Sequence, residues 1–470
     1  MSKKITTDSA DDGGISRRQM LRGIGAGGAL LAAGPLLAAC GSSSKSTSAT
    51  TTGGAGGTAA GTTGGSSTGG AVGSVADITK YYKLDTSHAG KGLALDMGLV
   101  LAFTGPGAFF GRTMSAGAKL AVQHIAALGG PNFNLIPKDH KSGDPQAGAN
   151  AVKELGLAKV PMCLASYVDD LGAMLAGTAQ YKMFTMDGGG GTSEFGKGKP
   201  YFWGTRAITP DDTIPGVAMY LQQKLPNVKK VVVNAWDLGA YNAGIKTYFT
   251  QQLAKVGVTL TSYNTTAVGA TDYSTAIAQI KSEDPDLVMI GIFGNDIGEF
   301  MKQYVVSGIN KPVMGFEYTL PSAQLAGSAY NNLYLAFDYF NAAQPDNGWA
   351  AIFIEEFKKA NGGTAPDYYA ANYYEDMFAM WTSVQRVIAS GGSPTDGTAL
   401  NQSLIANPNF DSLYGGTATT AGTLALDLTT HSVARRPMTL SICSNGSTST
   451  GATVTPLAYF NIGGADYHLA

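Results

Sequence analysis

The strongest constraint on the fold is a regular alternation of apolar, strand-like segments with amphipathic, helix-like segments, which begins at Leu93. In the first series, Leu95–Phe103 has the composition of a buried strand and Met114–Leu128 that of a helix. A second series starts with the strand-like segment Val228–Asn234 and the helix-like segment Tyr241–Val256. Strands separated by helices of this length predict mainly parallel sheets with helices on both faces, and two series predict two α/β lobes.

Residues 1–39 have the features of an export signal. The pair Arg17-Arg18, followed by apolar residues, resembles the twin-arginine signal, although the general secretory route is an alternative. The apolar segment Gly23–Leu37 is shorter than the roughly 20 residues that span a bilayer. Leu37-Ala38-Ala39-Cys40 resembles the bacterial lipobox, in which the cysteine thiol receives a lipid. We therefore expect Cys40 to be lipidated and to anchor the chain on the extracytoplasmic face of the cell membrane.

The segment that follows Cys40 consists almost entirely of Gly, Ser, Thr and Ala, and Lys45 is its only charge up to residue 76. Such a composition cannot bury enough apolar surface to fold, so we expect residues 40–76 to form a flexible tether. Residues 77–470 then form the folded region. The whole chain carries 32 basic and 34 acidic residues, and this balance disfavours nucleic acid and anionic bilayers as partners.

Two cysteines remain besides Cys40. Cys163 and Cys443 could form a disulfide in an oxidising compartment, or they could be two unrelated buried thiols. The sequence leaves both possibilities open.

The loops that follow the predicted strands are the expected ligand-binding positions, because ligands of parallel sheets bind beyond the carboxyl ends of the strands. These loops are rich in aromatic residues and carboxylates, and Arg112 is the basic residue that we place near them. An amine or a neutral polar ligand is therefore favoured over an anion. The candidate ligand-binding residues are Phe109, Phe110, Asp169, Asp187, Gly188, Gly189, Trp236, Tyr241, Phe293 and Glu317.

Several short motifs carry a family resemblance that runs from about Leu93 to about Asn461. They are Thr104-Gly105-Pro106, the segment from Lys138-Asp139 to Asp144-Pro145-Gln146-Ala147, Asp272-Tyr273-Ser274 and Gly315-Phe316-Glu317. In this order they resemble the leucine/isoleucine/valine-binding proteins, the receptors of branched-chain amino-acid ABC importers. The resemblance implies the two-lobed type I periplasmic-binding-protein fold with three crossovers. We place the first lobe at about 93–207 and 324–430, and the second at about 208–323 and 431–465.

The resemblance also implies residue roles. Glu317 matches the glutamate that holds the ligand ammonium group, and Phe109 or Phe110 matches the aromatic that covers the ligand. The family holds the ligand carboxylate with Ser and Thr hydroxyls and backbone N–H groups, whereas this sequence has Asp169-Asp170 and Asp187 in those loops. Backbone N–H groups of 188–191 could still bind an anion. A branched-chain amino acid is therefore in doubt, and an amide, a polyamine-like cation or an aromatic amine becomes credible.

Other interpretations stay open at this point. Each loop aspartate could simply cap a helix. The chain lacks the H-E-x-x-H, G-x-S-x-G and Walker motifs, and its histidines lack ligand spacing, so we expect no catalysis, no metal and no cofactor. A sensory module could use the same fold, and a secreted hydrolase is a weaker alternative. The main expectation is a monomeric solute-binding lipoprotein that captures a small amino-acid-like, amide or amine ligand and delivers it to an ABC permease.

Overall fold

The computed structural model describes residues 72–166, 168–189, 198–206, 212–239 and 241–470. Residues 69–470 form one unit, and the described strands in it make two sheets of mainly parallel strands. In spatial order, the first sheet contains β11 (Asn409–Thr417), β12 (Thr420–Asp427), β13 (Ser432–Val433), β5 (Phe202–Gly204), β4 (Phe184–Asp187), β3 (Met162–Ala165), β1 (Ala94–Leu101) and β2 (Asn132–Asp139).

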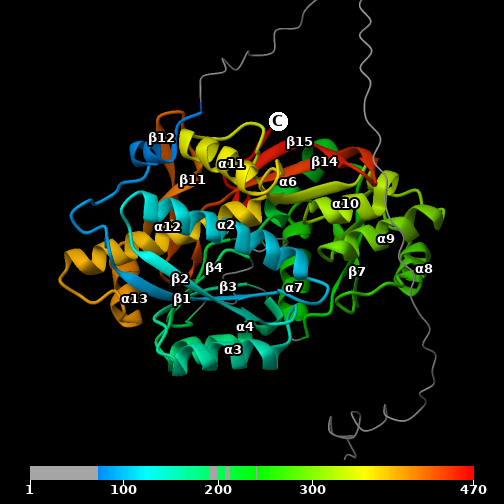
Figure 1. The fold of residues 1–470 in the computed structure, drawn as a ribbon. Coiled ribbons are helices and arrows are strands. Elements are labelled where there is room, and N and C mark those ends of the chain that lie inside the picture. Colours follow the sequence, from blue (N-terminus) through cyan, green and yellow to red (C-terminus); the bar gives the residue numbers. More distant parts are fainter. Residues whose placement is uncertain (1–71, 167, 190–197, 207–211, 240) are drawn as a thin grey trace, which may run out of the picture. The chain divides into compact units, whose positions relative to one another are not determined.

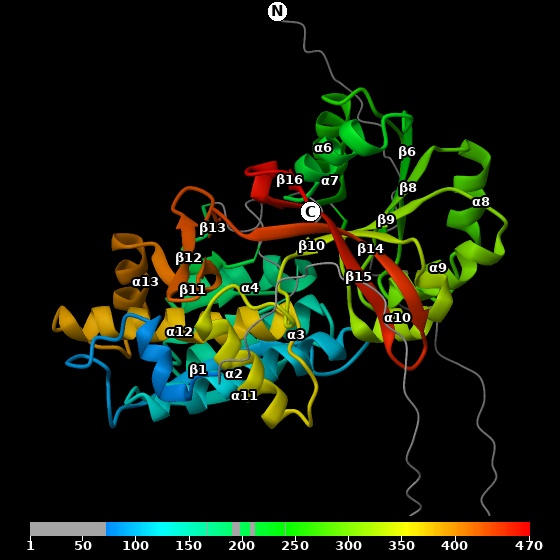
Figure 2. The same ribbon diagram turned by 90° about the horizontal axis from the view of Figure 1, so that it is seen from above.

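The second sheet is built in the same way, with a parallel part and an antiparallel edge. In spatial order it contains β16 (His468–Leu469), β15 (Gly451–Asn461), β14 (Pro437–Ser447), β10 (Tyr334–Asp338), β9 (Val313–Gly315), β8 (Leu287–Gly291), β6 (Lys230–Trp236) and β7 (Thr259–Thr266). Strands β6 to β10 pair in parallel, whereas β14 to β16 pair antiparallel, and Figure 2 shows β14 and β15 running together beside β10.

Helices cover both faces of each sheet. In Figure 1, α3 (Pro145–Leu157) and α4 (Val168–Gln180) lie on one side of the first sheet, and α2 (Ala108–Ala127) and α12 (Tyr368–Ala389) lie side by side on the other. In Figure 2, α6 (Ile214–Lys224) and α7 (Tyr241–Ala254) flank the second sheet opposite α8 (Ser274–Glu283) and α9 (Asn295–Val306). The remaining helices are α10 (Leu320–Ala326), α11 (Gly348–Ala360), α13 (Gly397–Ala406) and the short 3₁₀ segments Val75–Lys80, Gly327–Tyr330 and Ile462–Gly464.

The burial of alternate strand residues explains why both faces need helices. Along β6, Val231 and Val233 pack in the core that contains α6 and α7, and Val232 packs in the core that contains α8 and α9. In the first sheet, Leu99 likewise packs in one hydrophobic core and its neighbour Val100 packs in another. Because strand side chains alternate between faces, an apolar residue at every position requires a cover on both sides. The predicted fold class is confirmed.

The chain passes between the two sheets after β5, after β10 and after β13. The structure places the lobe boundaries differently from the sequence assignment. Strand β10 pairs with β9 and β14, so residues up to Asp338 belong with the second sheet rather than with the first lobe at 324–430. Strand β13 pairs with β5, so Ser432 and Val433 belong with the first sheet. Strands β10 and β13 have five and two residues, which is too short for their sequence periodicity to show which sheet they join.

Helix ends follow local capping rules. Asp144 accepts hydrogen bonds from the N–H groups of Gln146 (2.9 Å) and Ala147 (3.0 Å) at the start of α3, where Pro145 is the first helical residue. Asp367 and Asn347 cap α12 and α11 in the same way. Helix N-termini leave N–H groups without intrahelical partners, so these short polar side chains set where each helix begins.

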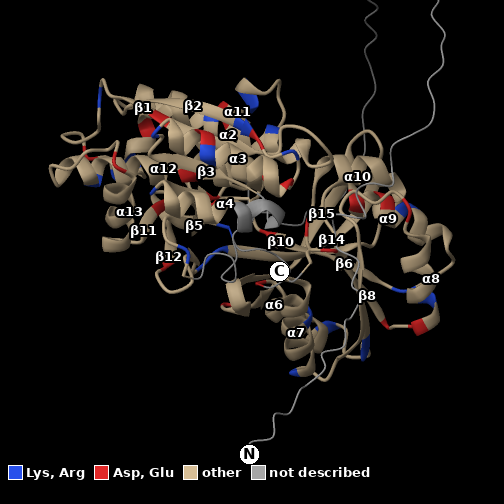
Figure 3. Ribbon diagram, turned by 90° about the horizontal axis from the view of Figure 1, so that it is seen from below, with Lys and Arg blue, Asp and Glu red and all other residues tan. Residues whose placement is uncertain are grey.

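Charges are distributed over both sheets. Figure 3 shows basic and acidic residues on the helices that surround each sheet, in agreement with the formal net charge of −2. In the part of the chain that the structure describes, no helix is long and apolar enough to cross a membrane.

The two cysteines in the described ranges are free and buried. Cys163 lies in β3 of the first sheet and Cys443 in β14 of the second, so the structure shows the two unrelated thiols rather than the disulfide. Burial raises the pKa of each thiol to about 12, which keeps both protonated at neutral pH.

The thiols provide a first prediction. In a Cys40→Ser variant, Cys163 and Cys443 should stay unreactive toward a thiol reagent in the native state, because the thiolate is the nucleophile and both groups are buried. Both should react once the protein is unfolded in guanidinium without a reductant. Recovery of fewer than two thiols per unfolded chain would indicate a disulfide instead.

The contact between α2 and α12 provides a second prediction. A Cβ atom at Gly117 would lie 2.0 Å from the carbonyl oxygen of Ala370, so Gly117→Ala should push the helices apart and destabilise the protein by about 1–3 kcal/mol. Gly244 in α7 has open space around it, and Gly244→Ala should instead stabilise by about 0.5–1 kcal/mol. Thermal unfolding of both variants measures the difference, and equal effects would refute the close contact.

Candidate ligand-binding site

A single buried carboxylate connects the second sheet to a helix of the first. Glu317 follows β9, and its side chain is fully buried. Its Oε2 accepts a hydrogen bond from the N–H of Gly294 (2.5 Å), which follows β8, and its Oε1 accepts one from the hydroxyl of Tyr369. Tyr369 lies in the first turn of α12. Loops at the carboxyl ends of β8 and β9 and the start of α12 therefore meet at Glu317.

A buried arginine lies next to this contact. Arg206 follows β5 and is 3% exposed. Its Nε donates to Asp338 Oδ2 (2.6 Å), and its Nη1 donates to the carbonyl oxygen of Gly189 (2.8 Å) and to the hydroxyl oxygen of Tyr369 (3.2 Å). The guanidinium also lies over the ring of Tyr369, 4.8 Å from its centroid. One tyrosine thus separates a buried positive charge from the carboxylate of Glu317.

Aromatic rings surround these polar groups. The ring of Phe110, in the first turn of α2, packs edge-on against Tyr369 with centroids 5.1 Å apart, and half-buried Phe109 lies beside it at 5.7 Å. A Cβ atom at Gly294 would lie 3.3 Å from the ring of Phe110, so the glycine allows this loop to approach the ring closely. The start of α2 therefore contributes an aromatic side chain next to Tyr369 and Gly294, the two donors to Glu317.

A second aromatic pair belongs to the second sheet. Trp236 ends β6 and packs against Phe293 with centroids 5.1 Å apart. The indole N–H donates to Asp296 Oδ2 (2.7 Å), and the N–H of Gly269 donates to the same oxygen (2.8 Å). Burial raises the pKa of Asp296. These bonds fix the orientation of Trp236 next to the loop that carries Gly294.

The loop after β4 is held by hydrogen bonds to Asp187 and from Asn372 of α12. Asp187 Oδ1 accepts the N–H of Gly189 (2.7 Å), and Asn372 Nδ2 donates to the carbonyl oxygen of Gly188 (3.0 Å). A Cβ atom at Gly188 would lie 2.5 Å from Asp376 Oδ2, so the loop leaves no room for a side chain there. The N–H of Gly189, which the sequence offered to a ligand anion, is used within the protein.

The electrostatics of Glu317 result from opposing effects. Burial raises the pKa of Glu317, and the hydrogen bonds from Tyr369 and Gly294 together with the charge of Arg206 counteract this rise. Asp367, the cap of α12, adds to the rise because its negative charge is nearby. The site therefore depends on its donors to stabilise the ionised carboxylate. Within the described ranges, no three His, Cys, Asp or Glu side chains are grouped to hold a metal ion.

Comparison with known proteins decides the family. The sequence profile described as periplasmic binding protein matches residues 95–440. The chain belongs to this family. The Leu/Ile/Val/Thr-binding protein of Salmonella typhimurium is 25% identical over 248 residues, which are 50% of this chain and 64% of the relative. The Leu/Ile/Val-binding protein of Escherichia coli K12 is 26% identical over 237 residues, 47% and 61% of the two chains. The chain thus spans less than two thirds of the length of these relatives.

Solved structures show the same fold. A branched-chain amino-acid transporter substrate-binding protein of Streptococcus pneumoniae, in complex with isoleucine, aligns with a TM-score of 0.64 and 20% identity, over 77% of this chain and 99% of that one. A solute-binding protein of R. palustris in complex with benzoate aligns with a TM-score of 0.65 and 20% identity, over 77% and 97%. The resemblance to the leucine/isoleucine/valine-binding proteins and the two-lobed fold are confirmed.

In this periplasmic binding protein, the predicted site residues fall into three groups. Phe110, Gly189 and Glu317 are connected through Tyr369 and Arg206, and Phe109, Asp187 and Gly188 adjoin them. Trp236 and Phe293 form a pair beside Gly294. Tyr241 begins α7 and is 38% exposed, and no described contact joins it to Glu317. The side chain of Asp169 and all of Cys40 lie outside the described residues.

Sequence reasoning missed Arg206 and Tyr369. We named Arg112 as the basic residue near the loops, but the structure brings Arg206 to the same place. Strand β5 has only three residues and shows no periodicity, so the loop after it was not recognised. Helix α12 carries two tyrosine pairs, Tyr368-Tyr369 and Tyr373-Tyr374, and nothing in their sequence separates packing residues from site residues. The hydroxyl of Tyr374 bonds buried His124 (2.7 Å), whereas Tyr369 reaches Glu317.

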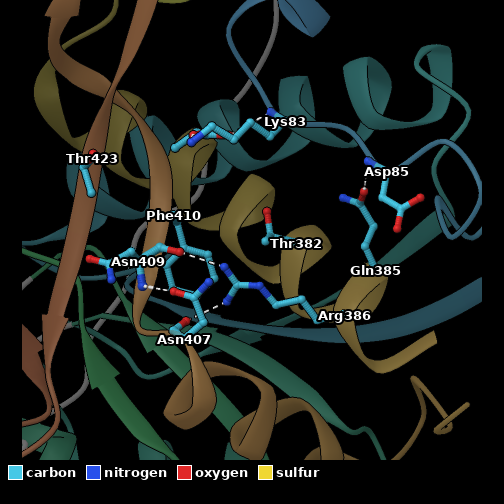
Figure 4. Close-up of a pocket in the computed structure, with 10 residues that line it drawn as sticks. Lys83, Asp85, Thr382, Gln385, Arg386, Asn407, Asn409, Phe410 and Thr423 are labelled. Carbon is cyan, nitrogen blue, oxygen red and sulfur yellow. Dashed lines mark hydrogen bonds and ion pairs between the residues drawn. The ribbon is translucent and has the colours of Figure 1, made fainter. Parts of the chain in front are cut away.

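A separate cavity of about 310 Å³ lies on the first sheet, between the segment before β1, α12 and β11 (Figure 4). Its polar groups bond each other. Arg386 donates to the carbonyl oxygens of Asn407 (2.6 Å) and Asn409 (2.7 Å), and the N–H of Lys83 donates to Asp411 Oδ2 (2.7 Å). These bonds attach the segment before β1 and the start of β11 to α12.

The buried carboxylate yields a third prediction. Because folding raises the pKa of Glu317 above its ordinary value of 4.5, the protein should lose stability from this group as pH rises through the interval between the two values. Glu317→Gln has no such loss, so its Tm relative to the wild type should increase from pH 4.5 to pH 8. Thermal unfolding across this range measures the trend. Asp237→Asn, which changes a carboxylate on an exposed turn, is the control, and a Tm difference for Glu317→Gln that is independent of pH would refute the assignment.

Proposed function

We propose that the chain is an extracytoplasmic solute receptor that captures one small polar molecule at Glu317 as its two lobes close, and delivers it to an ABC permease. The export signal at 1–39, the lipid on Cys40 and the tether at 40–76 would keep the receptor at the membrane surface. The relatives support this proposal, because they are named Leu/Ile/Val/Thr-binding protein and Leu/Ile/Val-binding protein.

The observation that carries the proposal is the buried carboxylate of Glu317, which accepts hydrogen bonds from both sides of the site. An ionised carboxylate has about four acceptor positions, so two bound donors leave capacity for an N–H group of a ligand. A buried charge without enough donors is costly, and a ligand ammonium or amide would relieve that cost. Selection of a donor-bearing ligand follows from this burial.

The aromatic rings and Arg206 refine the ligand class. The rings of Phe110 and Tyr369 lie near Glu317, and they could contact an amine or an apolar side chain of the ligand. Arg206 pairs with Asp338, and the N–H of Gly189 is bonded to Asp187, so these groups do not favour a ligand carboxylate, whereas Glu317 favours a ligand that donates hydrogen bonds. The proposed ligand is therefore amino-acid-like, or an amide or amine. Solved structures of the fold hold isoleucine in one case and benzoate in another, so both classes belong in the test.

The test is thermal unfolding of the purified protein against L-amino acids, amides, ureas, polyamines and aromatic acids. A ligand at 100 times its Kd should add about 2.7 kcal/mol of stability. With the ligand so found, Glu317→Gln should weaken binding ten-fold or more, since a hydrogen bond to a charged group contributes about 1.5–3 kcal/mol.

Glu283→Gln, at the end of α8, provides the matched control and should bind like the wild type. Unchanged affinity in Glu317→Gln would remove Glu317 from the site. A folded protein that responds to no compound in the panel would count against a receptor for these classes.

A further inference from the structure

A continuous chain of hydrogen bonds runs through the site and joins both sheets. Asp338 at the end of β10 accepts from Arg206, Arg206 donates to the hydroxyl oxygen of Tyr369, and Tyr369 donates to Glu317. The first and second of these bonds measure 2.6 and 3.2 Å. Arg206 belongs to the first sheet and Asp338 and Glu317 to the second, so the chain of bonds crosses between the sheets twice.

The direction of each hydrogen bond in this chain is determined by chemistry. Arginine can only donate, so its bond to Tyr369 occupies an acceptor position of the hydroxyl oxygen. The hydroxyl proton must then point elsewhere, and Glu317 Oε1 is the acceptor within reach. Arg206 is itself held by Asp338, by the carbonyl oxygen of Gly189 and by the Tyr369 ring beneath its guanidinium. Groups of the protein itself therefore determine the position of Arg206.

We propose that Arg206 is a positioning residue for Glu317: it orients the Tyr369 hydroxyl toward the carboxylate and places a positive charge beside it, which prepares Glu317 for the ligand. This inference rests on the proposed function for its purpose, but its test needs no ligand. The groups that face Glu317 are Arg206, Asp367, Tyr330, Tyr368 and Tyr369. Of these, Arg206 is the one that carries positive charge, and its charge opposes the effect of burial on the pKa of Glu317.

The chain offers a matched control in Arg436. Arg436 is 1% exposed, lies over the ring of Tyr414 at 4.2 Å, and bonds Glu375 (2.8 Å) and the carbonyl oxygen of Thr205 (2.5 Å). It therefore matches Arg206 in burial, in its carboxylate partner and in its ring contact. None of its described bonds reaches Tyr369 or Glu317.

The experiment is a double-mutant cycle read by thermal unfolding of the full-length chain at several pH values. Arg206→Gln, Glu317→Gln and the double variant are compared with the wild type, so that the separate loss of the Asp338 pair cancels. At pH 8, where more of Glu317 is ionised than at pH 4.5, Glu317→Gln should recover part of the Tm lost in Arg206→Gln. At pH 4.5 this recovery should be much smaller, because protonation removes the charge that Arg206 stabilises.

Arg436→Gln provides the control cycle, and Glu317→Gln should not recover its Tm at either pH. Equal recovery of Arg206→Gln at both pH values, or none at pH 8, would overturn the proposal.

If Arg206→Gln does not fold, the cycle is run with Tyr369→Phe, which removes the connecting hydroxyl and leaves the Arg206–Asp338 pair intact. In the wild-type background, Tyr369→Phe should lower the Tm more at pH 8 than at pH 4.5. In the Glu317→Gln background, it should lower the Tm equally at the two pH values. The same pH dependence in both backgrounds would also overturn the proposal. A failed cycle with intact ligand binding would reject only the role of Arg206, whereas a positive cycle without ligand binding would reject only the proposed function.

Discussion

Two buried arginines hold together the places where the chain passes between its sheets. Arg206, on the passage after β5, forms an ion pair with Asp338, where the passage after β10 begins. Arg436, on the passage after β13, donates to the carbonyl oxygen of Thr205 and pairs with Glu375 of α12. Removing such charges from water costs several kcal/mol per ion, so each pair persists only with well-placed partners. Replacing Arg206 would leave Asp338 without its ion-pair partner where the passage after β10 begins, and replacing Arg436 would leave Glu375 with its hydrogen bonds from Ser412 and Leu413 but no ion pair.

Helix α12 contacts both these buried arginines and the candidate ligand-binding residues. Tyr369 reaches Glu317, Asn372 supports the loop after β4, and Glu375 binds Arg436. These residues are spaced three apart, which places them along one face of a helix. Gly117 lets α2 pack closely against α12, and this contact restrains the position of α12. A change in the angle between the sheets would therefore alter bonds at the passages and at the site together.

The features of the fold and of the site that could be predicted are those whose signal lies in residues close together in the sequence. The main helices and parallel strands were predictable because burial on both faces produces long apolar runs at regular intervals, and Glu317 was found because it follows such a strand within a short motif. Arg206 follows a three-residue strand, and the role of Tyr369 depends on a contact with a residue 52 positions away. The use of the N–H of Gly189 by Asp187 likewise depends on the folded shape of one turn. Interactions of this kind arise from tertiary geometry and leave no periodic pattern in the sequence.

The attachment of the segment before β1 has a mechanical consequence. Tyr82 is buried against Trp381 of α12, and Lys83 and Asp85 bond to β11 and α12 through their backbone N–H groups. These anchoring contacts all belong to the first sheet. A pulling force applied to the chain on its N-terminal side would thus reach the first sheet before it reached the second.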